Sequence, residues 1–138
     1  MHNHMKWKQA QAAYQFPLFM VAVIFWVASQ IGVSAMAENV YGELAISIPV
    51  KAWAGGLLSA SSIYLLGIYI NGRWRWSASL RFIGALAHSA TFGLFSFSAS
   101  GTPDGLVVSA FSVVFLWVHL WFAWLNLVDL IGATRGRA

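Results

Sequence analysis

The residues with the clearest capacity for chemistry are two histidines, His88 and His119, which stand inside apolar segments. The point midway between them falls within the turn-forming sequence GTPDG at 101–105. If a hairpin closes there, both imidazoles lie about 23 Å from the turn along antiparallel helices. The two are then at equal depth, and subtracting the turn and the interfacial part of each helix places both near the middle of a membrane.

Two chemistries are open to such a pair. Facing imidazoles can be the axial ligands of a b-type haem, which makes His88 and His119 candidate cofactor-binding residues. Alternatively, each can hydrogen-bond a hydroxyl of a neighbouring helix. Hairpin helices lie only about 8–10 Å apart, which favours this structural pairing over a haem. The candidate hydroxyl partners are Ser59, Ser61, Ser62, Ser89 and Thr91.

The charged residues near the apolar segments suggest structural ion pairs. Asp129 lies near the end of the last apolar segment, and Arg81 lies at matching depth at the start of the preceding one. A carboxylate at this depth needs a partner, so we expect an Asp129–Arg81 pair, with a proton relay through Asp129 as the alternative. At the opposite end, Lys51 is expected to pair with Glu43 or Glu38.

The elements that position these residues are long apolar segments. The chain is 59% hydrophobic and only 9% charged, far from the roughly 25% charged residues of soluble domains. Four segments are long enough to cross a membrane as helices. The sequence therefore predicts an all-α integral membrane bundle forming a single domain, 1–138, with spans at about 16–34, 48–70, 80–100 and 106–131. Pro17 and Pro49 then fall in first helical turns.

Charge placement predicts the orientation. With both termini cytoplasmic, every lysine and arginine except Lys51 is on the cytoplasmic side, as the positive-inside rule requires. We therefore expect a multi-pass protein of the bacterial inner membrane. A competing interpretation takes residues 1–37 as a signal peptide that ends in Ala35-Met36-Ala37. The apolar run continues through Ile31 and Val33, which is longer than a typical signal core and favours retention.

Small and aromatic residues indicate how the helices pack. Small residues four apart let helix backbones approach closely in lipid. Such spacing occurs at Gly55, Gly56, Ser59 and Ala60 in the second span, and at Ala85, Ser89 and Gly93 in the third. Trp117, Trp121 and Trp124 form one helical stripe. We expect that stripe to face lipid or a neighbouring subunit, with a stacking platform for a quinone as the alternative.

Several function classes are excluded or disfavoured by what the sequence lacks. It has no cysteine, which excludes disulfides, thiolate metal sites and thiol nucleophiles. No catalytic motif or phosphate-binding glycine loop is present, and no soluble basic surface suits a nucleic acid. We therefore expect neither an enzyme nor a metal site nor a nucleic-acid partner. The expected partners are the lipid bilayer and, through oligomerisation or assembly, further membrane subunits.

One segment carries a resemblance. NGRWRWSASLRFIGAL, residues 71–86, is a basic-aromatic loop that leads into a small-residue helix. It resembles small polytopic membrane proteins encoded in tailed-phage genomes, some of which are holins that oligomerise and permeabilise the inner membrane. The resemblance implies a holin-like or accessory subunit. The alternatives are a haem b electron-transfer anchor and a small transporter or proton-conducting subunit.

Overall fold

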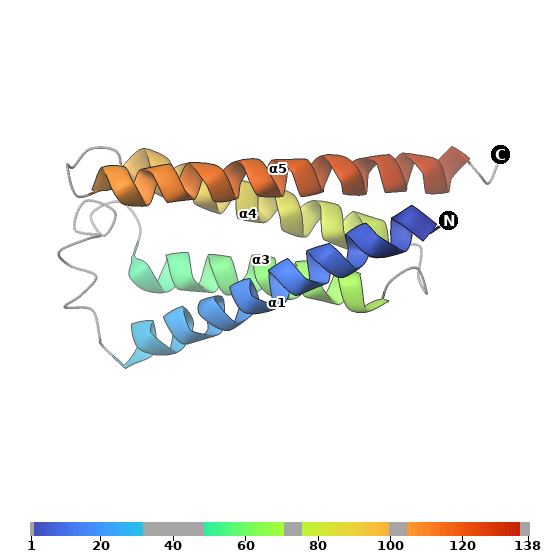
Figure 1. Cartoon of the computed structure of the whole chain (residues 1–138). Coiled ribbons are helices and arrows are strands. Elements are labelled where there is room, and N and C mark those ends of the chain that lie inside the picture. The colour runs from blue at the N-terminus through green and yellow to red at the C-terminus, as the bar shows by residue number, and fades with distance from the viewer. Residues whose placement is uncertain (1, 32–48, 71–75, 100–104, 136–138) are drawn as a thin grey trace.

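In the computed structural model, the described residues, 2–31, 49–70, 76–99 and 105–135, are almost entirely helical (Figure 1). The helices are α1 (His2–Gln30), α3 (Val50–Ile70), α4 (Ser77–Ala99) and α5 (Gly105–Arg135). Each contains a segment long and apolar enough to cross a membrane. These segments are Gln9–Gln30, Val50–Ile70, Ser77–Phe97 and Ser109–Gly132. The expectation of four helices of spanning length is thus confirmed for the described residues.

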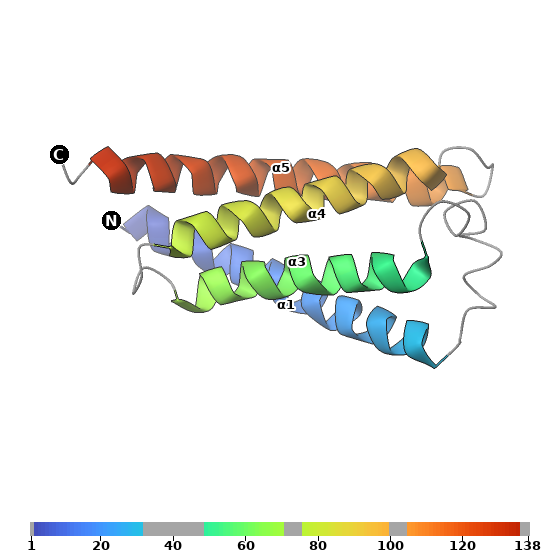
Figure 2. The same cartoon turned by 180° about the vertical axis from the view of Figure 1, so that it is seen from behind.

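Successive helices run antiparallel, so both chain termini lie at the same end of the bundle (Figures 1 and 2). We call this the terminal end, and the end where α1 finishes and α3 begins the opposite end. The helices α3, α4 and α5 form consecutive packed pairs, and α1 packs on α3. The helix α1 is oblique: its first half lies near α5, whereas its last half diverges from α5 (Figure 1). Of the expected GTPDG turn, residues 101–104 lie outside the described residues, and Gly105 begins α5.

The first helix differs from the sequence prediction. It begins at His2, well before the expected start near Phe16, so Pro17 stands inside the helix. Proline has no N–H, so the carbonyl four residues earlier loses its usual donor. The early start follows from residues 9–13, QAQAA, which are good helix formers. By contrast, Pro49 stands directly before α3, where its carbonyl accepts hydrogen bonds from Ala52 and Trp53.

Two glycines set the close approach of α3 and α4. A Cβ built on Gly84 would lie 2.8 Å from the Cα of Tyr64, and one on Gly67 would lie 2.8 Å from the backbone nitrogen of Arg81. Side chains larger than hydrogen do not fit these positions. The contact brings Tyr64 into a buried cluster with Ala85 and Ala123, which joins α3, α4 and α5.

The small residues expected at helix contacts divide into two groups. Gly55 faces Trp26 of α1, with 3.1 Å between its built Cβ and the indole ring, and Gly93 faces Leu116. Ala60, Ala85 and Ser89 are buried. Gly56 and Ser59, however, lie on the exposed side of α3, and no atom comes within 4 Å of a Cβ on Gly56. One residue of each predicted α3 pair, Gly55 or Ala60, therefore lies at a helix contact, whereas Gly56 and Ser59 do not. The closest approach of α3 to α4 is at Gly67, which was not predicted.

Candidate functional site

The centre of the bundle holds the two histidines in direct contact. His88 of α4 and His119 of α5 are fully buried. Their rings stack with centroids 4.5 Å apart and an interplanar angle of 22°. Phe92 stacks on the His119 ring at 5.5 Å, and Tyr14 approaches that ring at 5.6 Å. The structure thus brings together the pair that the hairpin spacing placed at equal depth.

Each histidine uses one ring nitrogen within its own helix. The Nδ1 atom of His88 lies 3.0 Å from the carbonyl oxygen of Gly84, and that of His119 lies 2.8 Å from the carbonyl oxygen of Phe115. A carbonyl only accepts, so each Nδ1 carries the proton and donates it. In a neutral imidazole the other nitrogen, Nε2, is then an acceptor.

The two Nε2 atoms accept hydrogen bonds from two further helices. Ser61 of α3 donates its hydroxyl to His88 Nε2 at 2.9 Å. Gln15 of α1 donates its amide N–H to His119 Nε2 at 3.1 Å. The stack therefore ties all four helices together at one level. Ser61 was among the candidate hydroxyls, but Gln15 was missed. A pair of glutamines four residues apart at the start of an apolar helix, Gln11 and Gln15, is the signal that could have found it.

This arrangement does not fit a b-type haem. Bis-histidine ligation needs both Nε2 atoms to face one iron from opposite sides of a porphyrin plane. Here the imidazole faces stack against each other at 4.5 Å. Both Nε2 atoms are also engaged, by Ser61 and by Gln15. The geometry matches the structural alternative, in which each histidine bonds across helices.

A second set of polar contacts lies toward the terminal end. Arg81 Nη2 lies 3.3 Å from Asp129 Oδ2, which is the expected pair between α4 and α5. Asn126 of α5 donates to the Tyr64 hydroxyl at 3.3 Å, and Ser77 Oγ donates to the carbonyl oxygen of Gly67 at 2.8 Å. These bonds connect α3, α4 and α5. The expected Lys51–Glu43 or Lys51–Glu38 pair involves acidic residues outside the described part of the chain.

Several buried polar atoms near these contacts have no hydrogen-bond partner among the described residues. On α1 they are both amide atoms of Gln11, the Tyr14 hydroxyl and Gln15 Oε1. On α5 the corresponding atom is Asn126 Oδ1. An unsatisfied polar group buried in an apolar medium is costly, so this cluster departs from the usual rule. Within the described ranges, no three His, Cys, Asp or Glu side chains come together to hold a metal ion.

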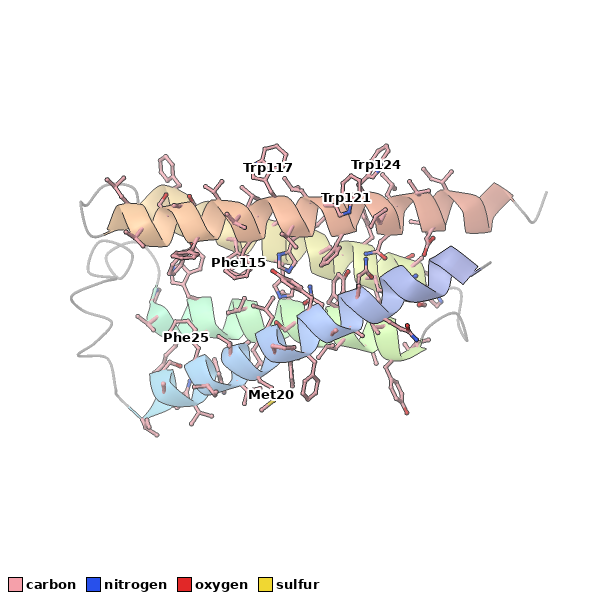
Figure 3. The ribbon with its side chains drawn as sticks, in the orientation of Figure 1. Met20, Phe25, Phe115, Trp117, Trp121 and Trp124 are labelled. Carbon is pink, nitrogen blue, oxygen red and sulfur yellow. The ribbon has the colours of Figure 1, made fainter. Side chains whose placement is uncertain are left out.

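The tryptophan stripe of α5 lies on the opposite side of that helix from the histidine. Trp117, Trp121 and Trp124 are 66%, 61% and 59% exposed. Trp117 and Trp124 point away from the bundle, whereas Phe115 points inward (Figure 3). The stripe is therefore an outer surface and does not contact the histidine stack.

Fold and site together define a class of protein: a bundle of helices of membrane-spanning length, joined by polar contacts between the helices. Comparisons of the chain with family models, with curated proteins and with solved structures give no match.

Proposed function

We propose that this chain is a non-enzymatic integral protein of the bacterial inner membrane, with both termini cytoplasmic. It acts by packing against copies of itself or against other membrane subunits, either as a holin-like protein or as an accessory subunit. The distribution of basic residues supports the orientation, because all of them except Lys51 then face the cytoplasm.

One observation carries this proposal. The histidine nitrogens, the groups best suited to chemistry, are engaged by Gly84, Phe115, Ser61 and Gln15 inside the bundle. Arg81 and Asp129 engage each other. These histidine, arginine and aspartate side chains therefore connect the helices, while the outer faces present large apolar and aromatic side chains to lipid or to another protein.

Controlled expression in a bacterial host tests the proposal and separates its two forms. A holin-like protein causes abrupt leakage of a cytoplasmic reporter once it reaches a threshold amount. An accessory subunit leaves the membrane intact and co-purifies in fixed stoichiometry with a membrane partner after cross-linking. A chain that does neither, and runs as a monomer in mild detergent after cross-linking in membranes, contradicts both forms.

A second candidate function is a small transporter or proton-conducting subunit. It is favoured by the unpartnered polar atoms of Gln11, Tyr14, Gln15 and Asn126. Buried groups of this kind are commonly satisfied by internal water, and a hydrated polar layer is one requirement of a proton path. In this candidate, Asp129 and the central histidines take part in moving the proton.

Proteoliposomes loaded with a pH-sensitive dye test this candidate. Under an imposed potential, a conducting protein acidifies the lumen, and Asp129→Asn slows that acidification severalfold. The exposed variant Trp117→Phe is the matched control and leaves the rate unchanged. A wild-type rate equal to that of protein-free liposomes excludes the candidate.

A further inference from the structure

Two tryptophans on the outer side of α5 lie where a membrane offers their N–H groups no acceptor. Trp121 stands at the centre of the spanning segment Ser109–Gly132, and Trp124 lies about 4.5 Å further along the helix. Both side chains are exposed, and neither has a hydrogen bond to a described residue. The polar boundary, where tryptophan is usually enriched, is about 15 Å from the centre of the hydrocarbon. Lipid tails therefore leave these two donors unsatisfied, which is costly.

The exposed side of α3 carries hydroxyl groups near the middle of its own span. Ser59 and Ser62 are exposed and lie next to the centre of Val50–Ile70. Ser62 donates its proton to the carbonyl oxygen of Leu58, so lone pairs of its Oγ remain available to a donor. The side is also narrow, because no atom comes within 4 Å of a Cβ built on Gly56. In the part of the chain that the structure describes, no other exposed polar side chain except the α5 tryptophans lies this deep.

Hydrogen bonding inside the bundle places these two faces at the same level. Asn126 of α5 bonds the hydroxyl of Tyr64 on α3, which is 62 positions earlier in the chain. Because α3 and α5 run in the same direction (Figure 1), residues separated by this number lie at about equal depth. Trp121 and Ser59 have the same separation, and the next residues along the two faces keep it. Two copies inserted in one orientation therefore bring the indole donors to the depth of the hydroxyl acceptors.

We propose that copies of this chain associate head to tail in the membrane, with the outer side of α5 in one copy packed on the exposed side of α3 in the next. Trp121 Nε1 donates to Ser59 Oγ of the next copy, and Trp124 Nε1 donates to Ser62 Oγ. The helix α4 lies between α3 and α5, so one copy can use both faces at once (Figure 2). A contact between two different faces continues from copy to copy and forms a ring or a row.

A second copy fits these faces better than lipid or a symmetric pair does. Small residues on the exposed side of α3 allow the large indole rings of α5 to approach closely. Lipid tails offer neither donors nor acceptors at this depth. Two α5 faces cannot satisfy each other, because the exposed side chains of α5 are apolar except for the indole donors. The donors of one face and the acceptors of the other are therefore matched only between unlike faces.

Disulfide cross-linking tests the contact, since the chain has no cysteine of its own. Ala52 and Val114 are exposed, have the same separation of 62 positions, and leave the indole and hydroxyl groups intact. The double variant Ala52→Cys with Val114→Cys, oxidised in bacterial membranes, is expected to give dimers, trimers and larger products. Neither single variant is expected to give them. The matched control is Val114→Cys with Leu94→Cys, an exposed pair at similar depth on α5 and α4, which is expected to give only the background of random collisions.

Removing one N–H group tests the hydrogen bonds. In the Ala52→Cys, Val114→Cys background, Trp121→Phe keeps an aromatic ring but removes the donor. It is expected to raise about threefold the amount of protein in the membrane at which half is cross-linked, as expected for one interhelical bond. Trp117→Phe makes the same change at the level of Gly55, where no hydroxyl lies, and is expected to change nothing.

Four results overturn the proposal. They are dimers from Val114→Cys alone, an equal yield from the control pair, a product that joins the chain to another protein instead of a second copy, and an unchanged requirement in Trp121→Phe. The cysteine pairs stand on exposed positions, so the cross-linking arm decides the matter even if a tryptophan variant does not fold.

This interface rests on the proposed function, in which copies of the chain pack together in the membrane, and a separate measurement tests that function. An amine-reactive cross-linker applied to the wild type in membranes detects self-association through any face. Oligomers in that experiment without products from the cysteine pair overturn this interface alone. An absence of oligomers in both experiments overturns self-association as well.

Discussion

The terminal and opposite ends of this bundle are held together by different kinds of contact. Toward the terminal end, Arg81 pairs with Asp129 across α4 and α5, and Ser77 bonds Gly67 across α4 and α3. Toward the opposite end, uncharged groups are in contact: the Ser96 hydroxyl bonds Ser109 across α4 and α5, and Trp53 packs edge-on against Phe95. In the membrane location proposed above, lipid tails solvate an apolar side chain about as well as another helix does, so polar bonds and close backbone packing determine where the helices lie.

The path of α1 illustrates the difference. Gln15 fastens its first half to His119 of α5. Beyond this bond, Ile24 and Val27 are largely exposed, and the helix diverges from α5 (Figure 2). Beyond the Gln15 bond, a pocket of about 200 Å³ lies between α1, α3 and α4, and Val21, Phe25 and Trp53 help to line it.

The largest loss of stability is expected from Asp129→Asn. The variant keeps the size of the side chain but leaves the buried Arg81 guanidinium without this carboxylate. Breaking one side of a buried pair costs about 3–5 kcal/mol, a large part of the about 5–15 kcal/mol by which folded proteins are stable, so less of the folded chain accumulates. The measurement is unfolding by a denaturing detergent, followed by circular dichroism, together with the protein level in membranes.

The charge-exchanged double variant, Arg81→Asp with Asp129→Arg, is the control. It restores opposite charges between α4 and α5 and is expected to recover part of the lost protein level. Asp129→Asn with wild-type stability would mean that the pair does not hold the terminal half together.

The second largest loss of stability is expected from Gly84→Ala. A Cβ at this position lies 2.8 Å from the backbone of Tyr64, so α3 and α4 must separate. Overpacking of this kind costs about 1–3 kcal/mol. Gly56→Ala is the matched control, because its Cβ meets no atom and alanine favours a helix. The same unfolding measurement should show a loss for Gly84→Ala and none for Gly56→Ala. Equal losses would place the close contact elsewhere.

Part of this arrangement could be predicted from the sequence, because the turn of a hairpin fixes how far along its two helices each residue lies. Residues equally far from one turn meet, so the pairs His88–His119 and Arg81–Asp129 could be predicted by counting from the GTPDG segment. Apolar segments of about 20 residues likewise predicted helices of spanning length.

Other features depend on the angle at which the helices cross, which the spacing of residues along the sequence does not encode. The Gln15–His119 bond exists because α1 runs obliquely past α5. The glycine contacts use one residue from each helix, Gly67 on α3 and Gly84 on α4. A search for small residues four apart on one helix misses both of these glycines, and it selects the exposed Gly56 together with buried residues such as Ala60.

A smaller difference in stability is expected between variants of the two glutamines of α1. Gln15→Leu removes the donor to His119 Nε2, and interhelical bonds of this kind average about 0.6 kcal/mol with a maximum near 1.7. Gln11→Leu removes an amide that bonds no described residue, so its stability is expected to stay equal or rise. Unfolding in detergent compares the two. A loss in Gln11→Leu as large as that in Gln15→Leu would show that water satisfies the Gln11 amide, which would favour the proton-conducting candidate.

We expect that the chain does not bind haem. Binding an iron between His88 and His119 would require the rings to unstack from 4.5 Å and both Nε2 atoms to leave Ser61 and Gln15. Those rearrangements would break the hydrogen bonds by which Ser61 of α3 and Gln15 of α1 join the two histidines. The chain purified from haem-replete cells should therefore be colourless, and an absorption spectrum checks this. A Soret band lost in both His88→Ala and His119→Ala would show that the stack opens, and that the centre of the bundle is a cofactor site instead of a fastening.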